Sequence, residues 1–227
     1  MTDRWTQSVR HQLGLGRLLP LGGARDGAWI AEEAAEAVLR RAVRGMRGVR
    51  LESLRIALVD PEAAREPVVP PPPSALPPGP LRVSAGFAAT AREPLPTTAD
   101  RLRTGLATAA TELLGLAVAE VDLEVTALLD EEPEAEPVRR RPEPPSAVVA
   151  DDPAAAAALA VPGVAGVTAA LGQAVRSEAA LPRGHVRVEV AVDADHRALD
   201  VALAVREQVG KALPGHPTVA VLVTAVG

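Results

Sequence analysis

Residues 42–49 read AVRGMRGV and residues 160–167 read AVPGVAGV, so Ala, Val, Gly, Gly and Val recur in the same order and spacing. A second matched pair follows later in the chain: residues 121–128 read VDLEVTAL and residues 219–226 read VAVLVTAV. Because both pairs occur in the same order, we interpret the chain as an internal duplication. A repeat of this kind indicates two copies of one structural unit.

The spacing of apolar residues predicts the elements of each copy. For the first copy it predicts a helix over 29–43, strands over 54–59 and 81–91, a helix over 98–114 that stops at Gly115, and a strand over 118–128. For the second copy it predicts a helix over 154–160, an extended piece over 166–175, a strand over 186–190, a helix over 196–213 and a strand over 219–226. We therefore expect an α+β fold of two tandem αββαβ units, each a small sheet with helices packed on one face.

Shifts in composition divide the chain into an N-terminal arm at 1–27, a first unit at 28–130, a linker at 131–152 and a second unit at 153–227. The linker is acidic, then basic and then rich in proline, as connecting segments often are. The first unit carries a proline-rich insertion at 67–80. Proline lacks the backbone donor that a central strand needs, so we expect an extended excursion between two strands, whose length has little effect on stability.

The composition excludes several classes of chemistry. Of the 227 residues, 48% are hydrophobic but only 1% are aromatic, and there is no Cys. We expect a core of Val, Leu and Ala, and the lack of thiols excludes disulfides, thiolate nucleophiles and cysteine-type zinc sites. A net charge of −5 with almost no aromatic side chains for stacking disfavours general nucleic-acid binding.

No segment has the pattern of a membrane anchor or a secretory signal. The uncharged stretch 153–175 is long enough to cross a bilayer, but it contains Pro162 and several Gly and owes much of its apolarity to Ala. The N-terminus lacks the apolar run of a signal peptide. We expect a cytoplasmic protein without a direct membrane span.

Histidines and aspartates gather in the second unit and raise the question of a metal site: His185, His196, His216, Asp193, Asp195 and Asp200. A parallel strand–helix–strand crossover would place His185 and His216 at one end of the sheet and His196 at the other, roughly 25 Å away. Asp195 is better placed to cap a helix. Nucleophile, base and orienting group are nowhere concentrated, so we predict no catalytic residue, no metal, no cofactor and no enzymatic activity.

One stretch of the acidic chain is strongly basic. Five arginines fall within residues 40–50: Arg40, Arg41, Arg44, Arg47 and Arg50. They either form a solvated face at a helix C-terminus, where cations are favoured, or bind an anionic partner, for which the chain's own acidic run at 130–136 is one candidate.

The arm offers a second candidate interaction site. Trp5, Val9 and Leu13 stand at four-residue spacing, so a short helix would align one of only three aromatic residues with two aliphatic ones. This stripe either packs on the chain's own first unit or anchors a partner or a second copy.

The order of a helix, a Gly-Val corner, two strands, a crossover helix and a Val-rich closing strand resembles the alkaline-shock, or envelope stress response, family. The stretch from Glu112 through Gly115 to Val118, followed by the alternating residues 121–125, is similar to the short helix, Gly and strand of that family. The resemblance covers 28–128 well and 154–226 loosely, and extends to actinobacterial proteins labelled after a nucleopolyhedrovirus fibrous protein. It implies a non-enzymatic protein and, as for some members, a partner anchored in the membrane.

These observations favour a non-catalytic cytoplasmic scaffold or adaptor that acts through protein–protein contacts or self-association, and the resemblance implies an association with the envelope or with stress. The alternative is a small-molecule or nucleic-acid binding protein that uses the arginines of residues 40–50.

Overall fold

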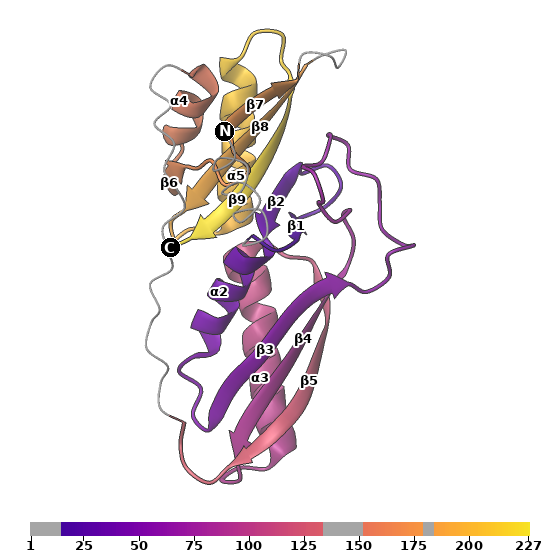
Figure 1. The fold of residues 1–227 in the computed structure, drawn as a ribbon, viewed down its shortest axis with the longest axis vertical. Coiled ribbons are helices and arrows are strands. Elements are labelled where there is room, and N and C mark those ends of the chain that lie inside the picture. The colour runs from indigo at the N-terminus through magenta and orange to yellow at the C-terminus, as the bar shows by residue number, and fades with distance from the viewer. Residues whose placement is uncertain (1–14, 134–151, 179–183) are drawn as a thin grey trace, which may run out of the picture.

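The computed structural model describes residues 15–133, 152–178 and 184–227. Within these residues the chain is an α+β protein with two β-sheets, as the sequence predicts (Figure 1). The two sheets lie at opposite ends of the molecule, and helix α2 lies between them (Figure 1).

The larger sheet has six strands: β1 (Leu18–Leu21), β2 (Ala28–Ala31), β6 (Val164–Val167), β7 (Val175–Glu178), β8 (His185–Val192) and β9 (Thr218–Val226). Their order is β1-β2-β9-β8-β6, and β7 also pairs with β8. Strands β2, β9 and β8 run parallel to one another, whereas β1, β6 and β7 are antiparallel to their neighbours. Helices α4 (Pro153–Leu159) and α5 (Ala198–Ala212) pack on this sheet and on each other.

The smaller sheet has the order β3 (Val49–Leu58), β4 (Leu81–Thr90) and β5 (Val118–Leu129). Strand β3 is antiparallel to β4, and β4 is parallel to β5. Helices α2 (Glu32–Val43) and α3 (Leu95–Ala109) pack together, and a single π-helical turn, η1 (Ala110–Leu114), extends α3. Both halves of the chain therefore contain a parallel strand pair joined by a helix, β4-α3-β5 and β8-α5-β9.

The first predicted helix differs from the structure at its beginning. Residues 28–31 form strand β2, and the helix starts only at Glu32. Trp29 and Ile30 are buried because β2 lies between β1 and β9, with Trp29 opposite Leu222. The predicted division at residue 28 thus meets a strand that belongs to the sheet of the second unit.

Two smaller expectations also differ from the structure. The extended piece at 166–175 is two short strands, β6 and β7, separated by a loop that folds over β8. Asp195 does not cap α5, which begins at Ala198 after Arg197; the aspartate that caps a helix is Asp152, whose carboxylate accepts the amides of Ala154 and Ala155 at the start of α4. The predicted stop at Gly115 is confirmed, since this residue is left-handed with φ of 84°.

The proline-rich segment connects β3 to β4, as expected of an excursion between two strands, but it is packed structure. The amide of Leu76 donates to the carbonyl of Leu18 at 2.8 Å, and the indole Nε1 of Trp29 donates to the carbonyl of Leu76 at 3.4 Å. Val69 is only 2% exposed. The insertion between β3 and β4 therefore covers β1 and β2 of the large sheet. The expectation that its length has little effect on stability assumed a free loop and did not include this packing.

Two adjacent valines test this packing. Replacing Val69 by Ala removes buried methyl groups and leaves a cavity, so we expect the free energy of unfolding to fall by about 2 kcal/mol. Val68 is 66% exposed, so Val68→Ala is expected to have almost no effect. Urea unfolding of both variants measures the difference; equal and negligible changes would mean that the segment is a free loop.

Gly115 lies where the two halves meet. Its carbonyl accepts the amide of Gly22 at 3.0 Å, and a Cβ at this position would stand 2.4 Å from the Cβ of Leu199 in α5. A side chain is therefore disfavoured twice, by the left-handed backbone and by a clash with a neighbouring helix.

We expect Gly115→Ala to lower the free energy of unfolding by about 2–4 kcal/mol, the sum of the left-handed penalty and overpacking. Gly45→Ala is the control, because a Cβ at Gly45 would have no heavy atom within 4 Å among those described. Chemical denaturation should separate the two variants clearly. Similar stabilities would show that the contact with α5 is not maintained in solution.

Candidate functional site

The predicted basic patch lies around the end of α2 and the start of β3, but its arginines have separate partners. Arg40 donates to the carbonyls of Leu51 and Glu52, both at 3.4 Å. Arg41 donates to the carbonyl of Val226 at the end of β9, at 3.1 Å. Both side chains therefore tie α2 to its neighbours.

The other three arginines differ from these two in their partners. Arg50 forms an ion pair with Glu52 at 3.0 Å. Arg44 and Arg47 are exposed, and no side-chain partner is found for either among the described residues. The described part of the acidic run does reach this corner, but the carboxylate of Glu132 accepts the backbone amide of Gly48 and not a guanidinium. Trp5, Val9 and Leu13, the candidate anchor of the arm, lie outside the described residues.

A row of polar residues occupies one face of β8. Gly210 of α5 lies over Val219 of β9, since a Cβ at Gly210 would be 4.0 Å from the Val219 side chain. The face of the sheet that bears Val219 and its register partner Val186 therefore faces α5. Alternate residues of a strand point to opposite faces. His185, Arg187 and Glu189 therefore point away from α5, yet all three are buried, at 5%, 7% and 0% exposure.

The loop between β6 and β7 buries Glu189. Its carboxylate accepts the amide of Leu171 at 3.0 Å, and its backbone bonds to Thr168 and Ala174 on either side of that residue. The guanidinium of Arg187 lies 3.4 Å from the same carboxylate. Burial outweighs these favourable contacts and raises the pKa of Glu189 to about 7.

Arg187 is also buried, and its Nε donates to no protein group among the described residues. Burial, and secondarily the nearby charge of Arg176, lower its pKa despite the attraction of Glu189. His185 has a lowered pKa as well, chiefly because of burial, and its Nδ1 shares a hydrogen bond of 2.8 Å with the Thr218 hydroxyl. At neutral pH this imidazole is therefore uncharged.

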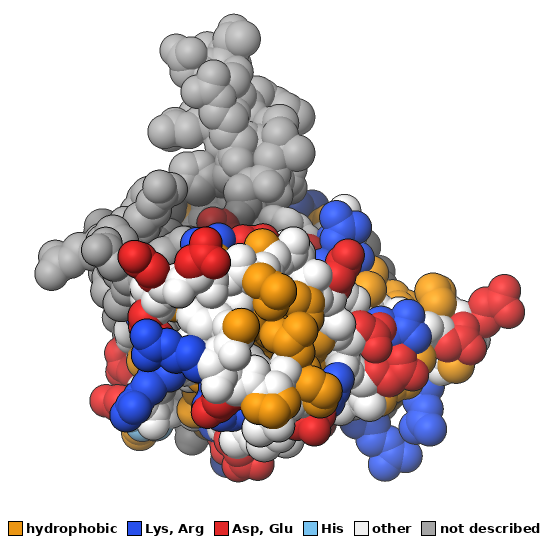
Figure 2. All heavy atoms as spheres, turned by 90° about the horizontal axis from the view of Figure 1, so that it is seen from below, with side chains coloured by type: hydrophobic (Ala, Val, Ile, Leu, Met, Phe, Trp, Pro, Cys, Tyr) orange, Lys and Arg blue, Asp and Glu red, His pale blue; other side chains and the backbone are white. Residues whose placement is uncertain are grey.

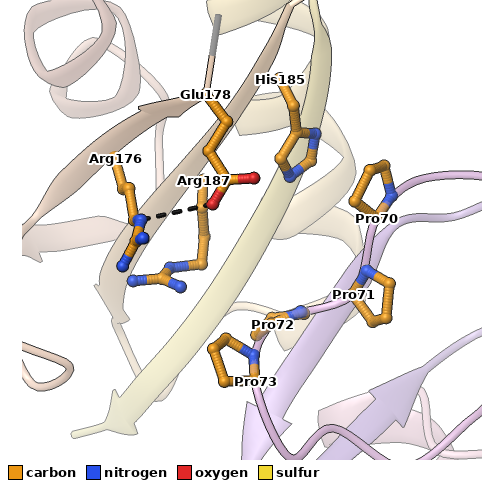
Figure 3. A pocket seen from close by; sticks show the side chains of 8 residues that line it. All are labelled: Pro70, Pro71, Pro72, Pro73, Arg176, Glu178, His185 and Arg187. Carbon is orange, nitrogen blue, oxygen red and sulfur yellow. Dashed lines mark ion pairs between the residues drawn. The ribbon is translucent and has the colours of Figure 1, made fainter. Parts of the chain in front are cut away.

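The outer end of this row opens into a small hollow of about 140 Å³. On one side stand the charged and polar side chains of β7 and β8, and on the other the rings of the prolines at 70–73 (Figure 3). Arg176 of β7 lies directly opposite Arg187 of β8 in the register and forms an ion pair with Glu178 at 3.3 Å (Figure 3). Two cationic side chains, Arg176 and Arg187, thus line the hollow together with one carboxylate, that of Glu178.

The small sheet presents a different kind of surface. Helix α3 covers one face, and none of the described helices covers the other (Figure 1). Strands β3 and β5 end the sheet, so each has an outer edge that pairs with no strand among the described residues. On the uncovered face, β3 contributes Arg55 and β5 contributes Asp122 on either side of Ser84, so the face is basic along one edge and acidic along the other.

Ion pairs fix part of this face. Arg82 of β4 reaches Glu120 at 2.7 Å and Asp122 at 3.2 Å, both on β5. Glu124, next in the acidic row, is exposed. Leu128, near the end of the strand, is 62% exposed and shares the face of its register partner Ala89, opposite to that of the acidic row. Viewed from the end formed by the small sheet, hydrophobic side chains gather in a patch bordered by acidic and basic ones (Figure 2).

Histidines and aspartates are spread out as the predicted crossover requires. His185 begins β8 and His196 follows its end. Within the described ranges, no group of three or more His, Cys, Asp or Glu side chains is arranged to hold a metal ion. None of the helices described there has the length and apolarity needed to cross a bilayer.

Comparisons of the chain with protein-family models, with curated proteins and with solved structures find no match. The resemblance to the alkaline-shock family therefore stays a prediction.

Sequence reasoning missed the polar row of β8. The alternation of Val with Arg187 and Glu189 predicts a strand over 186–190, and it is also the ordinary pattern of a strand with one solvated face. No local sequence signal distinguishes β8 from a strand with one solvated face. The groups that bury its charges come from residues 168–174 and from the prolines at 70–73, which are distant in sequence.

The raised pKa of Glu189 predicts a pH dependence of stability. Between about pH 4.5 and 7 the folded protein keeps a proton that the unfolded chain has released, so the contribution of Glu189 to stability is full below this range and is lost as the pH rises through it. The loss amounts to about 3 kcal/mol. Gln mimics the protonated form, so the free energy of unfolding of Glu189→Gln, relative to the unsubstituted protein, should increase by about this amount from pH 4.5 to 8.

Glu207→Gln is the control, because Glu207 is exposed and its hydrogen bond and charge contact with Lys211 lower its pKa. Its relative stability should change little, and in the opposite direction. Denaturant unfolding at pH 4.5, 6 and 8 measures all three proteins. A constant difference between Glu189→Gln and the unsubstituted protein would show that Glu189 is solvated.

Proposed function

We propose that this protein is a non-catalytic adaptor that binds a protein partner along β5 of the small sheet. The observation that carries the proposal is the outer edge of this sheet on β5, a strand of 12 residues, which no other described strand pairs with and whose face no described helix covers. Unpaired backbone groups on an edge strand are a template for an added strand from another chain.

The side chains of β5 define the chemistry of the partner. Glu120, Asp122 and Glu124 form an acidic row, of which Arg82 neutralises only the first two. Leu128 adds an exposed apolar contact at the end of the strand. The partner that complements this surface is an extended segment with basic residues followed by an apolar one.

The edge is only partly protected against such pairing. Natural edge strands avoid unwanted pairing with bulges and charges, and β5 has register shifts opposite Leu81/Arg82 and Phe87/Ala88. Arg103 also donates to the carbonyl of Val121 at 3.3 Å and so occupies one outer group. The stretch beyond Val121 keeps its free edge in the part of the chain that the structure describes.

The alternative, a binding protein that uses the arginines of residues 40–50, has weaker support. Arg40 and Arg41 bind backbone carbonyls, and Arg50 is paired with Glu52, which leaves Arg44 and Arg47 without a side-chain partner among the described residues. The adaptor proposal carries with it a cytoplasmic location, and the family resemblance adds a partner at the envelope that is itself membrane-anchored.

The test is cross-linking and co-purification of the full chain from its native host, with three variants. Leu128→Lys and Glu124→Lys alter the proposed surface, and both positions are exposed, so the melting temperature should not change. We expect each to reduce recovery of the partner about tenfold, the effect of roughly 1.4 kcal/mol of lost binding energy.

The matched control is Leu159→Lys, since Leu159 is 52% exposed on α4, remote from β5. Recovery of the same partner by this variant and loss with Leu128→Lys would support the proposal. Equal recovery by all variants would place docking elsewhere. If neither a partner nor self-association in light scattering is found for the unsubstituted chain, the adaptor proposal fails.

A further inference from the structure

The hollow between β7, β8 and the prolines at 70–73 is separate from the proposed partner surface. Its floor contains Arg187, which is 7% exposed. A guanidinium has five N–H donors. Among the described residues the Arg187 side chain makes one long hydrogen bond, 3.4 Å from an Nη to the Glu189 carboxylate, and its Nε has no protein acceptor. Buried donors are normally satisfied, so this side chain is suited to an acceptor that enters the hollow.

Arg176 supplies a second cation at the mouth of the same hollow. It lies opposite Arg187 in the register of β7 and β8, and its side chain is 52% exposed. Like charges directly across a strand pair repel one another. An anion between the two guanidinium groups would relieve this repulsion and pair with both.

The size and the opposite wall of the hollow limit what can enter. Its volume is about 140 Å³, and a protein cavity of about 150 Å³ holds one benzene molecule. The wall that faces the arginines consists of the rings of Pro70, Pro71, Pro72 and Pro73 (Figure 3). Proline has no backbone N–H, so this wall offers apolar rings and no amide donors.

We propose that this hollow binds a small organic carboxylate, with its carboxylate between Arg176 and Arg187 and its hydrocarbon part against the prolines at 70–73. The planar fork of a guanidinium matches the two oxygens of a carboxylate. The ligand is a short-chain acid of about the size of benzene, because a longer chain exceeds the volume.

The acidic residues near the hollow do not neutralise both arginines, so a negatively charged ligand is still favoured. Glu178 is held by Arg176, and Glu189 lies behind Arg187, bonded to the amide of Leu171. Glu189 is partly protonated near neutral pH, and the imidazole of His185 is neutral. The two arginines therefore exceed the ionised carboxylates around them.

Butyrate is the probe, titrated into the full chain by calorimetry and by NMR of the backbone amides. We expect saturable binding with a Kd in the millimolar range or below. Butanol, which lacks the charge, and decanoate, which is too long, should bind at least about tenfold more weakly. Phosphate should also be weaker, because it has no part that contacts the prolines.

Arg176→Gln is the decisive variant, since Arg176 is half-exposed and its replacement should leave the fold intact. It should weaken butyrate binding about tenfold. Arg103→Gln, which removes an exposed arginine paired with Asp100, is the matched control and should bind as the unsubstituted chain does. Arg187→Lys keeps the charge, loses the fork and should also weaken binding if it folds.

Three results would overturn the proposal: no saturable butyrate binding, equal affinity in Arg176→Gln and Arg103→Gln, or phosphate binding as tight as butyrate binding. Leu128→Lys should bind butyrate normally. Failure of the ligand site and failure of the proposed adaptor surface are thus measured separately.

Discussion

The parallel pairing of β2 with β9 is the constraint on which the rest of the structure depends. Three consecutive residues of β2, at 28–30, lie opposite residues 221–223 of β9, and Trp29 among them is 1% exposed. Burial of a large apolar side chain is worth about 1.5–3 kcal/mol. Helix α2 begins immediately after this strand, so the small sheet is joined to the large one without an intervening linker.

Arg17 reinforces this junction. Its carbonyl accepts the amide of Glu32, the first residue of α2, and its guanidinium binds the Glu32 carboxylate at 2.8 Å and the carbonyl of Ile56 in β3. Burial alone would raise the pKa of Glu32, but the hydrogen bonds and charge of Arg17 outweigh burial and lower it. One arginine thus connects the β1 hairpin, α2 and the small sheet.

The same constraint separates the two candidate surfaces. Because β1 and β2 extend the large sheet, the insertion between β3 and β4 reaches across to that sheet and covers its polar face near Arg187. Buried ion pairs are costly because both charges lose their hydration, so the Arg187–Glu189 pair is not explained by stability. Within the described ranges, no segment covers the outer face of the small sheet in the same way, and β5 keeps an unpaired edge (Figure 1).

The sequence by itself determined the α+β class, most helices and strands, and the stop at Gly115, because these follow from local periodicity and backbone preference. Only the tertiary structure decided that Trp29 belongs to a strand, since its partner Leu222 is nearly the whole chain away. It also decided that Arg187 and Glu189 are buried. Their alternation with Val is a local pattern, whereas the loop and the prolines that cover them come from distant segments. The burial of a strand face depends on what packs against it as well as on the strand's own sequence.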